Sequence, residues 1–278
     1  MLDDVLPLLG CPHCGALLTR RGKSVACANG HAFDVARQGY VSLLPGDVHL
    51  GSADTAEMVG AREAFLDAGH FAPLAEALAD AAEGAFGAEA GAPGCILDLG
   101  AGPGWYLAHV LDRFPGRLGL ALDLSKHALR RAARAHPRIA AVACDAWRRL
   151  PVQEASAALV LNVFAPRNGS EIARMLQPGG ALVVVTPTGR HLAELVSAFG
   201  LLTVDERKEE RLAAELGADL DLERRTELEW PLTLAPSDVA NAVAMGPSAH
   251  HVPTGGRRAG GMETLASVTI SIYRRRSG

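Results

Sequence analysis

A glycine-rich turn at residues 95–110 (CILDLGAGPGWYLAHV) constrains the fold of this chain more than any other feature. The apolar residues before the turn form a run short enough for a buried strand, and the residues after the turn continue as a helix. Gly100, Gly102 and Gly104 lack β-carbons, so backbone N–H groups at the start of that helix can approach a ligand closely. The stretch therefore predicts a strand, a tight turn and a helix that together bind a cofactor.

The spacing of the glycines separates two classes of nucleotide site. The dinucleotide fingerprint has the form G-x-G-x-x-G, and its last glycine would fall on Trp105. The motif that stands here is D-x-G-x-G-x-G, beginning at Asp98. It resembles the first motif of the class I S-adenosylmethionine-dependent methyltransferases. A tight turn with a purely structural role is the alternative at this point.

Four further apolar runs follow this strand, and polar side chains stand where three of them end. The second strand ends at Asp123, the third at Asp145 and the fourth at Asn162. Strands that alternate with helices predict an α/β fold, a doubly wound, mostly parallel sheet that binds ligands at the carboxyl ends of its strands. Asp123 can accept both hydroxyls of a ribose there, and Asp145 can accept from an adenine amino group.

Other patterns extend this domain on both sides. A helical pattern at 55–86 is interrupted by Gly69, which predicts two helices with His70 and Phe71 at the join. Ser125 caps a helix that is rich in basic residues over 126–134. Alternating residues at 267–276 predict an antiparallel closing strand, and 224–234 predicts a strand before it.

The composition bounds the size and the environment of the protein. A chain of 278 residues, 49% of them hydrophobic, can bury one full-sized core and still supply a small module. The formal net charge of −4 gives no global field for nucleic acid, so any RNA contact depends on local patches. No apolar run is long enough to span a bilayer, and the N-terminus lacks the pattern of a signal peptide. We expect a cytoplasmic protein with reduced cysteines and no membrane partner.

Cysteine and histidine residues near the N-terminus have the spacing of metal ligands. Two residues separate Cys11 from Cys14, and three separate Cys27 from His31. Three thiolates and one imidazole nitrogen would complete a tetrahedral zinc site with no position left for water, which indicates a structural role. A segment this short cannot build its own core, so the metal would supply on the order of 10 kcal/mol of its folding free energy. His13 is expected on the surface.

Basic and aromatic side chains interleave with this module, as looped or single-stranded RNA would require. These side chains are Arg20, Arg21, Lys23, Arg37 and Tyr40. Ordinary solvated charge is the alternative, and composition alone favours it. The predicted organisation is a zinc-binding module at 1–45, a turn-rich linker at 46–54 and a methyltransferase domain at 55–278.

Motifs over nearly the whole chain resemble one family. They are FDVARQGYVSLL, ARxxFLDxGHF, LDLGAGPG, NVFAPR, LQPGG and TPxxxHLxEL, together with the zinc-ligand spacing. They resemble the 23S ribosomal RNA guanine-N1 methyltransferases of the RlmA type, and NVFAPR and VAMGPS are similar to its tylosin-resistance branch. The resemblance implies methyl transfer from S-adenosylmethionine to a guanine in a 23S rRNA hairpin loop beside the macrolide site, of the 748 type rather than the 745 type. It also implies that the zinc-binding module at 1–45 is an RNA-recognition module.

The resemblance also implies roles for single residues. The zinc ligands would be Cys11, Cys14, Cys27 and His31. The cofactor-binding residues, to which the strand-end argument adds Asp145, would be Phe71, Gly100, Gly102, Pro103, Gly104, Asp123, Asp145 and His191. Phe71 stands where the family often has tyrosine, and it keeps the apolar role of that ring. His191 would lie near the methyl-donor end.

Methylation at guanine N1 requires removal of the proton that N1 carries. We expect the enzyme to hold N1 in line with the methyl group while a polar group takes the proton. The expected catalytic residues are Asn162 and His191. The amide of Asn162 does not titrate, so it would orient the flipped guanine through its Watson–Crick edge. The candidate proton acceptors, which spacing does not separate, are His191, Asp145, His250 and His251.

Two other functions stay open at the level of sequence. One is a small-molecule methyltransferase of antibiotic biosynthesis, with the zinc module as a stabilising clip. The other is a non-catalytic RNA-binding adaptor, against which the intact glycines and Asp123 argue. The segment around His250 and His251 is shorter and richer in glycine than in the family, which puts substrate contacts there in doubt. The family resemblance suggests a homodimer, and resistance that needs a partner methylation.

Overall fold

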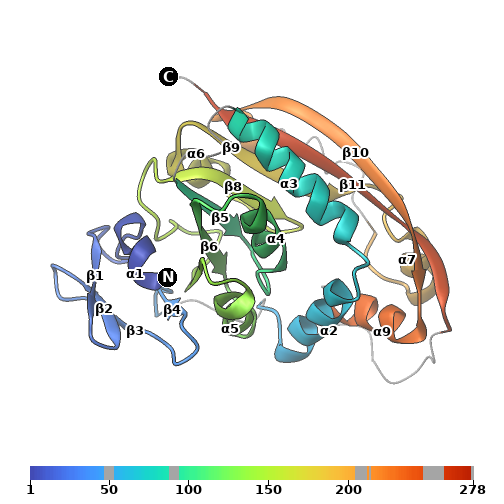
Figure 1. Cartoon of the computed structure of the whole chain (residues 1–278), viewed down its shortest axis with the longest axis horizontal. Helices are drawn as coiled ribbons and strands as arrows, with labels where there is room; N and C mark the ends of the chain where they lie inside the picture. The colour runs from blue at the N-terminus through green and yellow to red at the C-terminus, as the bar shows by residue number, and fades with distance from the viewer. Residues whose placement is uncertain (47–52, 88–93, 204–211, 213, 247–259, 277–278) are drawn as a thin grey trace.

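The structure is a computed structural model that describes residues 1–46, 53–87, 94–203, 212, 214–246 and 260–276. Its main sheet consists of β4 (Val41–Ser42), β5 (Gly94–Leu99), β6 (Arg117–Asp123), β7 (Ile139–Ala143), β8 (Ala157–Val163), β9 (Leu176–Pro187), β10 (Leu220–Leu234) and β11 (Met262–Arg275). The strands lie in the order β10-β11-β9-β8-β5-β6-β7-β4 (Figure 1). The five strands β5, β6, β7, β8 and β9 pair in parallel with their neighbours in the sheet, which confirms the predicted α/β fold.

The chain reverses its direction of travel across the sheet at β5. From β5 it passes through α4 (Trp105–Arg113) to β6 and through α5 (Lys126–Ala135) to β7 on one side. It then returns to β8, which pairs with the other edge of β5 and leads through α6 (Gly169–Met175) to β9. A doubly wound sheet has its crevice at such a switch point, beyond the carboxyl ends of the strands.

Two long strands complete the sheet beyond β9. Strand β11 pairs antiparallel with β9, and β10 pairs antiparallel with β11 over nearly its whole length. The predicted antiparallel closing strand is therefore confirmed. Figure 1 shows this pair sweeping along one side of the molecule, with α3 (Ala72–Phe86) running beside it.

Helices α2 (Ala56–Asp67) and α3 flank the crevice and are separate, as predicted, with a turn at Gly69 between them. Gly69 has a φ of 82°, a backbone conformation that glycine adopts without strain. Helix α2 packs against α9 (Pro236–Ala244), which follows β10. This contact brings the C-terminal part of the fold over the carboxyl ends of the central strands. The short helix α7 (Ala193–Phe199) packs against β11.

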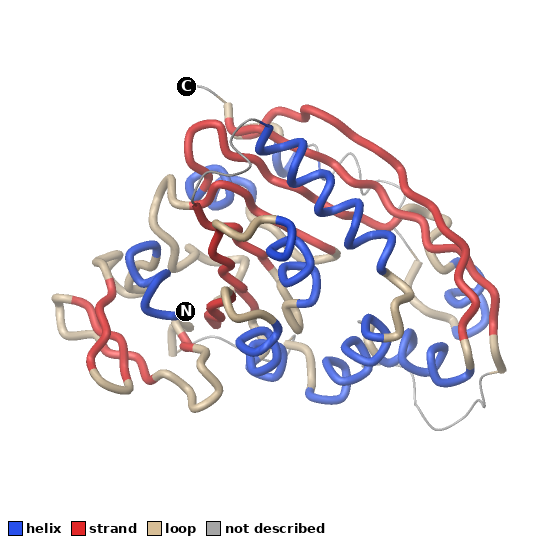
Figure 2. Tube along the Cα trace, in the orientation of Figure 1, coloured by secondary structure: helices blue, strands red, loops and turns tan. Residues whose placement is uncertain are grey.

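The N-terminal segment forms a small antiparallel sheet and also joins the main sheet. The small sheet contains β1 (Leu18–Arg21), β2 (Ser24–Cys27) and β3 (Ala32–Asp34), and stands to one side of the molecule (Figure 2). Strand β4 then pairs in parallel with β7 at the edge of the main sheet.

The first residues of the chain pack on the main sheet as well. Helix α1 (Leu2–Val5) and the 3-10 helix η1 (Leu6–Leu8) precede the small sheet. Buried Leu2 and Val5 belong to the same apolar core as Leu120 and Val142 of the central strands. The zinc module is therefore anchored by hydrophobic packing and by strand pairing. The domain limits at 45 and 55 stay a prediction. No helix among the described residues is long and apolar enough to cross a membrane.

Candidate functional site

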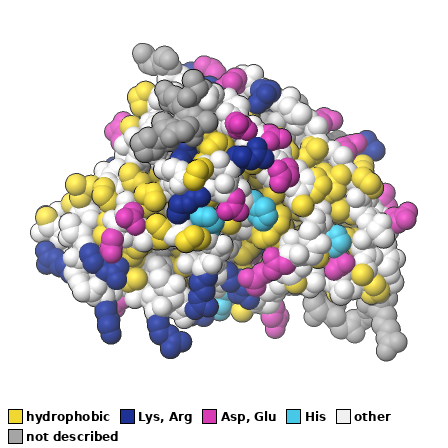
Figure 3. Space-filling model, viewed as in Figure 1, with side chains coloured by type: hydrophobic (Ala, Val, Ile, Leu, Met, Phe, Trp, Pro, Cys, Tyr) yellow, Lys and Arg dark blue, Asp and Glu magenta, His cyan; other side chains and the backbone are white. Residues whose placement is uncertain are grey.

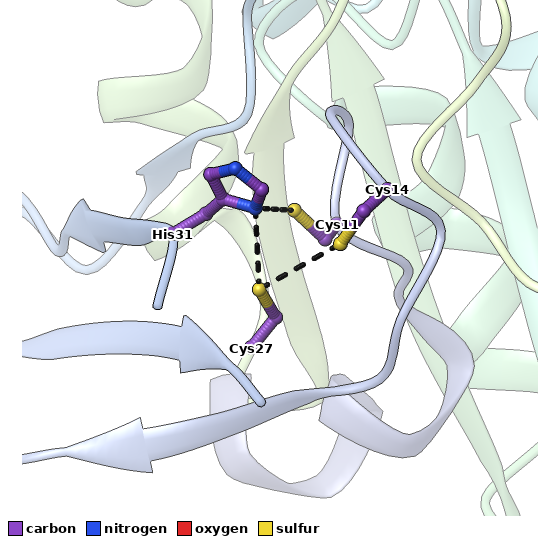
Figure 4. A group of neighbouring side chains, drawn as sticks. All are labelled: Cys11, Cys14, Cys27 and His31. Atoms are coloured by element: carbon purple, nitrogen blue, oxygen red, sulfur yellow. Dashed lines mark hydrogen bonds between the residues drawn. The ribbon is translucent and has the colours of Figure 1, made fainter. Parts of the chain in front are cut away.

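The four residues expected to hold zinc come together in the N-terminal module (Figure 4). His31 Nδ1 lies 3.5 Å from Cys11 Sγ and 3.4 Å from Cys27 Sγ. Cys14 Sγ lies 3.8 Å from Cys27 Sγ, and all four donor atoms are within 4.8 Å of one another. A tetrahedral zinc ion with bonds of about 2.3 Å to sulfur and about 2.0 Å to nitrogen requires S···S separations of about 3.8 Å and S···N separations of about 3.5 Å. The side chains fit a closed zinc site that uses Nδ1 of the histidine.

Two glycine turns shape this cluster. Gly15 has a φ of 73° and directly follows the pair Cys11 and Cys14. Gly30 has a φ of 86° and lies between Cys27 and His31. A backbone hydrogen bond from Ala16 is the largest of the contributions that lower the pKa of Cys14 to about 6. This favours the thiolate, the form that binds metal. His13 stacks on a neighbouring phenylalanine ring and lies outside the ligand set, as expected.

A cavity of about 460 Å³ lies at the carboxyl ends of the central strands. The glycine turn after β5 forms one wall, and residues that follow β6, β7 and β8 form others. Among the predicted cofactor residues, those that line it are Phe71, Gly100, Gly102, Pro103, Asp123 and Asp145. Its volume and its mixed apolar and charged walls are typical of a small-molecule site.

Asp123 is held in place by the glycine turn. Gly102 N donates to its Oδ2 at 2.8 Å, and Ser125 N donates to its Oδ1 at 2.7 Å. Each carboxylate oxygen has a second lone pair, so both can still accept from a ligand. Burial is the main cause that raises the pKa of Asp123. Asp145, after the next strand, accepts from Trp147 N at 3.0 Å and also faces the cavity.

Asp98 contributes an unpaired carboxylate oxygen to the cavity. The side chain lies in β5, is 1% exposed and lines the cavity floor. Its Oδ1 is buried with no hydrogen-bond partner among the described residues. Burial, followed by the charge of Asp123, raises the pKa of Asp98 to about 8. A buried polar atom of this kind requires a partner, and a ligand in the cavity is positioned to supply one.

The opposite wall of the cavity depends on Arg62 of α2. Its guanidinium pairs with Asp54 and donates to the backbone oxygen of Met245 at 2.7 Å. Ser125 Oγ in turn donates to the backbone oxygen of Asp54 at 2.7 Å. Arg62 therefore ties α2, the end of α9 and the start of α5 together around the cavity.

The three glycines of the turn have different structural roles. A β-carbon on Gly100 would lie 2.3 Å from Ala165 Cβ, so this glycine allows two loops to touch. A β-carbon on Gly102 would meet nothing closer than 3.6 Å, at Arg62. Gly104 does not line the cavity; its β-carbon would lie 3.0 Å from Ala132 Cα, so it permits the close packing of α4 on α5.

Comparisons with known proteins agree with both parts of this structure. Residues 9–49 match the zinc-ribbon family described as RlmA, N-terminal, and residues 96–180 match a methyltransferase domain family. The 23S rRNA (guanine(748)-N(1))-methyltransferase of Streptomyces fradiae is 49% identical over 274 residues, which cover 98% of this chain and 97% of the relative. The chain belongs to the family of 23S rRNA (guanine-N1)-methyltransferases.

A second relative supports the same family. A protein of Micromonospora griseorubida, with a provisional name as a 23S rRNA (guanine-N(1)-)-methyltransferase, is 49% identical and is covered over 90% of each chain. Among solved structures, YcgJ of Bacillus subtilis aligns with a TM-score of 0.48 at 13% identity, over 67% of this chain and 94% of that chain. The family membership makes this chain an S-adenosylmethionine-dependent methyltransferase with a structural zinc site.

The structure of this methyltransferase does not support the expected guanine contact of Asn162. The side chain is fully buried and does not line the cavity. Its Nδ2 donates to the backbone oxygens of Leu99 at 3.1 Å and Pro166 at 3.0 Å, and its Oδ1 accepts from Arg167 Nε at 3.0 Å. The amide therefore holds the loop after β8 against the glycine turn and is not available to a base.

His191 also lies outside the set of residues that line the cavity. Its Nδ1 accepts from Ser267 N at 3.2 Å, and its ring centroid is 6.0 Å from Phe71 and 5.6 Å from Phe164. It buttresses these two aromatic rings, both of which face the cavity. His250 and His251 lie outside the described residues.

Sequence reasoning missed two aromatic side chains at the cavity. Phe164 is 39% exposed and has a φ of 53°, a conformation that side-chain-bearing residues rarely adopt. Trp147 is 66% exposed and follows Asp145 by two residues. Each of these residues lies two positions after a predicted site residue, Asn162 or Asp145, and this closeness in sequence is the signal that could have identified them. The sequence does not show their exposure or the strained backbone of Phe164.

Proposed function

We propose that this methyltransferase modifies N1 of a guanine in a hairpin loop of 23S rRNA, at the position that corresponds to guanine 748. The observation that carries the proposal is identity of 49% along nearly the full length of the Streptomyces fradiae enzyme, through the zinc module as well as the methyltransferase domain. The proposal includes a contribution to tylosin or macrolide resistance together with a partner methylation. It also includes a homodimer, the expectation from family resemblance.

The cavity residues fit S-adenosylmethionine in distinct ways. Asp123 would accept from the ribose hydroxyls and Asp145 from the adenine amino group. The unpaired Oδ1 of Asp98 would accept from the amino group of the methionine part. Gly102 leaves the space into which a side chain would otherwise project, and Phe71 supplies an apolar wall. When bound, the cofactor supplies an electrophilic methyl group on its sulfonium.

The chain itself has to hold a guanine in front of that methyl group. Phe164 is the residue that we assign to this task in place of Asn162, because its exposed ring faces the cavity from the end of β8. Its left-handed backbone is maintained by a hydrogen bond from its N–H to the oxygen of Val185 at 3.1 Å. Strain of this kind, on the order of 1–3 kcal/mol, persists where the surrounding structure enforces it and is concentrated at functional sites. Stacking on an aromatic ring is how enzymes hold a base that has left its stack.

The proton of guanine N1 needs an acceptor other than Nδ1 of His191. That nitrogen already accepts from a backbone N–H, so in the neutral ring Nε2 carries the proton. His191 then acts on the reaction by supporting the rings of Phe71 and Phe164. Proximity and alignment of N1 with the methyl group are the contribution that the chain can make through these rings.

Mass mapping of methylated nucleotides tests the proposed function. A strain that lacks the gene would be complemented with the native protein or with Asp123→Ala, and its 23S rRNA would be digested and mapped. We expect one N1-methylguanosine, at the 748 position, with the native protein and none with the variant. Absence of the mark, or a mark at another nucleotide, would overturn the proposal and favour a small-molecule substrate or a different target.

A pair of Phe164 variants tests the stacking role. Phe164→Tyr keeps the ring and should keep methyl transfer within a few-fold of native, whereas Phe164→Ala should reduce it by roughly tenfold to a hundredfold, because stacking contributes about 1–3 kcal/mol per base. Cofactor affinity, measured by calorimetry, should change little in either variant. Equal rates for the two variants would exclude a stacking role.

A further inference from the structure

Helix α5 presents a row of cations that the fold does not use. Ala128, Leu129 and Ala132 form its buried side. Lys126, Arg130 and Arg134, spaced four residues apart, lie along one outer row, and His127 and Arg131 lie beside them. Arg131 pairs with Glu63 at 2.7 Å. By contrast, Lys126, Arg130 and Arg134 make no ion pair with a carboxylate of the described residues, and Arg130 Nε is buried without a hydrogen-bond partner there.

This arrangement of charge opposes the stability of the helix. Like charges four residues apart on a helix repel each other and destabilise it. Lys126 also stands in the first turn, where the helix dipole disfavours a cation. Burial is the main cause that lowers the pKa of His127, and the charges of Lys126, Arg130 and Arg131 lower it further. Because this row of charges does not stabilise the helix, we expect it to serve binding of a ligand.

An open groove beside this row leads to the cofactor cavity. It has a volume of about 710 Å³ and lies between α2, α4 and α5, with Arg130, Arg131 and Arg134 on one wall. Gln38 of the N-terminal module lines one part of it, whereas Pro103 and Trp105 line both the groove and the cavity.

The carboxylates of the groove do not cancel this charge. They are Glu63, Asp67 and Asp112. Glu63 is paired with Arg131, and Asp112 lies 3.3 Å from Nε2 of His136. Only Asp67 of these three has no such partner in the ion pairs of the described residues, against two unpaired arginines. Figure 3 shows Lys and Arg side chains gathered along the lower edge of the molecule, from the N-terminal module toward α5.

We propose that Lys126, Arg130 and Arg134 form a track for the phosphate backbone of the substrate RNA; Arg130 and Arg134 line the groove that shares Pro103 and Trp105 with the cofactor cavity. Residues four apart on a helix are about 6 Å apart along its axis, which is comparable to the separation of neighbouring phosphates on one strand. Phosphate contacts of this kind set the register of a nucleic acid and leave recognition of the base to other residues. The inference rests on the proposed function, because it takes the rRNA hairpin as the ligand.

The test is the salt dependence of RNA binding. A triple variant, Lys126→Ala, Arg130→Ala and Arg134→Ala, removes the row and keeps a good helix former at each position. A 23S rRNA hairpin that carries the target guanine would be titrated at several salt concentrations, with fluorescence anisotropy as the readout. We expect affinity at physiological salt to fall by about tenfold or more. The slope of log K against log salt should become shallower by about 0.7–0.9 for each phosphate that the variant no longer neutralises.

A matched control removes the same amount of charge elsewhere. Arg113, Arg274 and Arg276 are each paired with carboxylates on other surfaces, and their triple alanine variant should keep the native slope. Affinity for S-adenosylmethionine should match the native value in both variants. A native slope in the α5 variant, or equal losses in the two variants, overturns the track. Methylation of the hairpin by the native protein is scored separately: if it fails, the proposed function falls, and if native RNA binding is also absent, both fall.

Discussion

Replacing Asn162 by alanine measures how much the buried amide that holds the loop after β8 contributes to the free energy of unfolding. The change removes three hydrogen bonds, at 3.0 to 3.1 Å, and leaves the Leu99 oxygen and the Arg167 Nε without these partners. Each neutral bond contributes about 1 kcal/mol net and the bond to the charged guanidinium about 2 kcal/mol. We therefore expect the free energy of unfolding to fall by about 3–5 kcal/mol, and Tm to fall by roughly 6–15 °C.

The assay combines thermal unfolding with single-turnover methylation of the rRNA hairpin. Methyl transfer should fall with stability, because the loop that carries Phe164 loses its anchor. Asn168→Ala on the same loop is the control: its side chain caps α6 by accepting from Glu171 N, so it should cost about 1 kcal/mol and spare methylation. If Asn162→Ala abolishes methylation while Tm stays native, the amide contacts the guanine after all and the reasoning is refuted.

Three further predictions concern the glycine turn, the buried carboxyl and the zinc site. Gly100→Ala should destabilise the protein by roughly 2–4 kcal/mol in urea unfolding, because left-handed strain adds to overlap with a neighbouring β-carbon. Gly102→Ala should cost only about 1–2 kcal/mol but weaken cofactor binding, since its methyl group enters the cavity; equal stability losses would contradict this contrast. The folded-state pKa of Asp98, at about 8, lies above its ordinary value, so ionisation opposes folding and stability should decrease as pH rises from about 4 to 8. Asp98→Asn should flatten this part of the profile, measured without cofactor, and an unchanged slope would show that another group is responsible. Elemental analysis should find one zinc per chain, lost in Cys27→Ser and kept in His13→Ala; zinc retention by the cysteine variant would exclude the proposed ligand set.

The zinc ligands and the carboxylates at the strand ends could be predicted because local spacing determines them. Two short ligand pairs with glycine turns can close on one metal in few ways, so Cys11 and His31 meet as expected. Likewise, the carboxyl ends of parallel strands share one edge of a sheet, which brings Asp123 and Asp145 to the same cavity. Ligand spacing was enough to predict the zinc site, and the order of strands and helices was enough to predict the carboxylates at the cavity.

Contacts between distant segments could not be predicted in the same way. Strand β4 has only two residues, and its pairing with β7 joins positions about a hundred residues apart. The burial of Leu2 and Val5 against the central strands likewise depends on packing between distant segments. No local pattern in the sequence encodes either contact, because any exposed strand edge or apolar face offers the same chemistry.

The loop after β8 shows most clearly what the sequence determines and what only the tertiary structure decides. Its sequence, NVFAPR, determines that a polar side chain and an aromatic ring stand at a strand end, near the cofactor motif. Only the tertiary structure decides which of the two faces the cavity. Backbone oxygens of two loops and the guanidinium of Arg167 converge on Asn162, while a positive φ turns Phe164 toward the cavity. Side-chain direction at a strand end depends on φ and on partners from elsewhere in the chain, so residue type alone could not assign the roles.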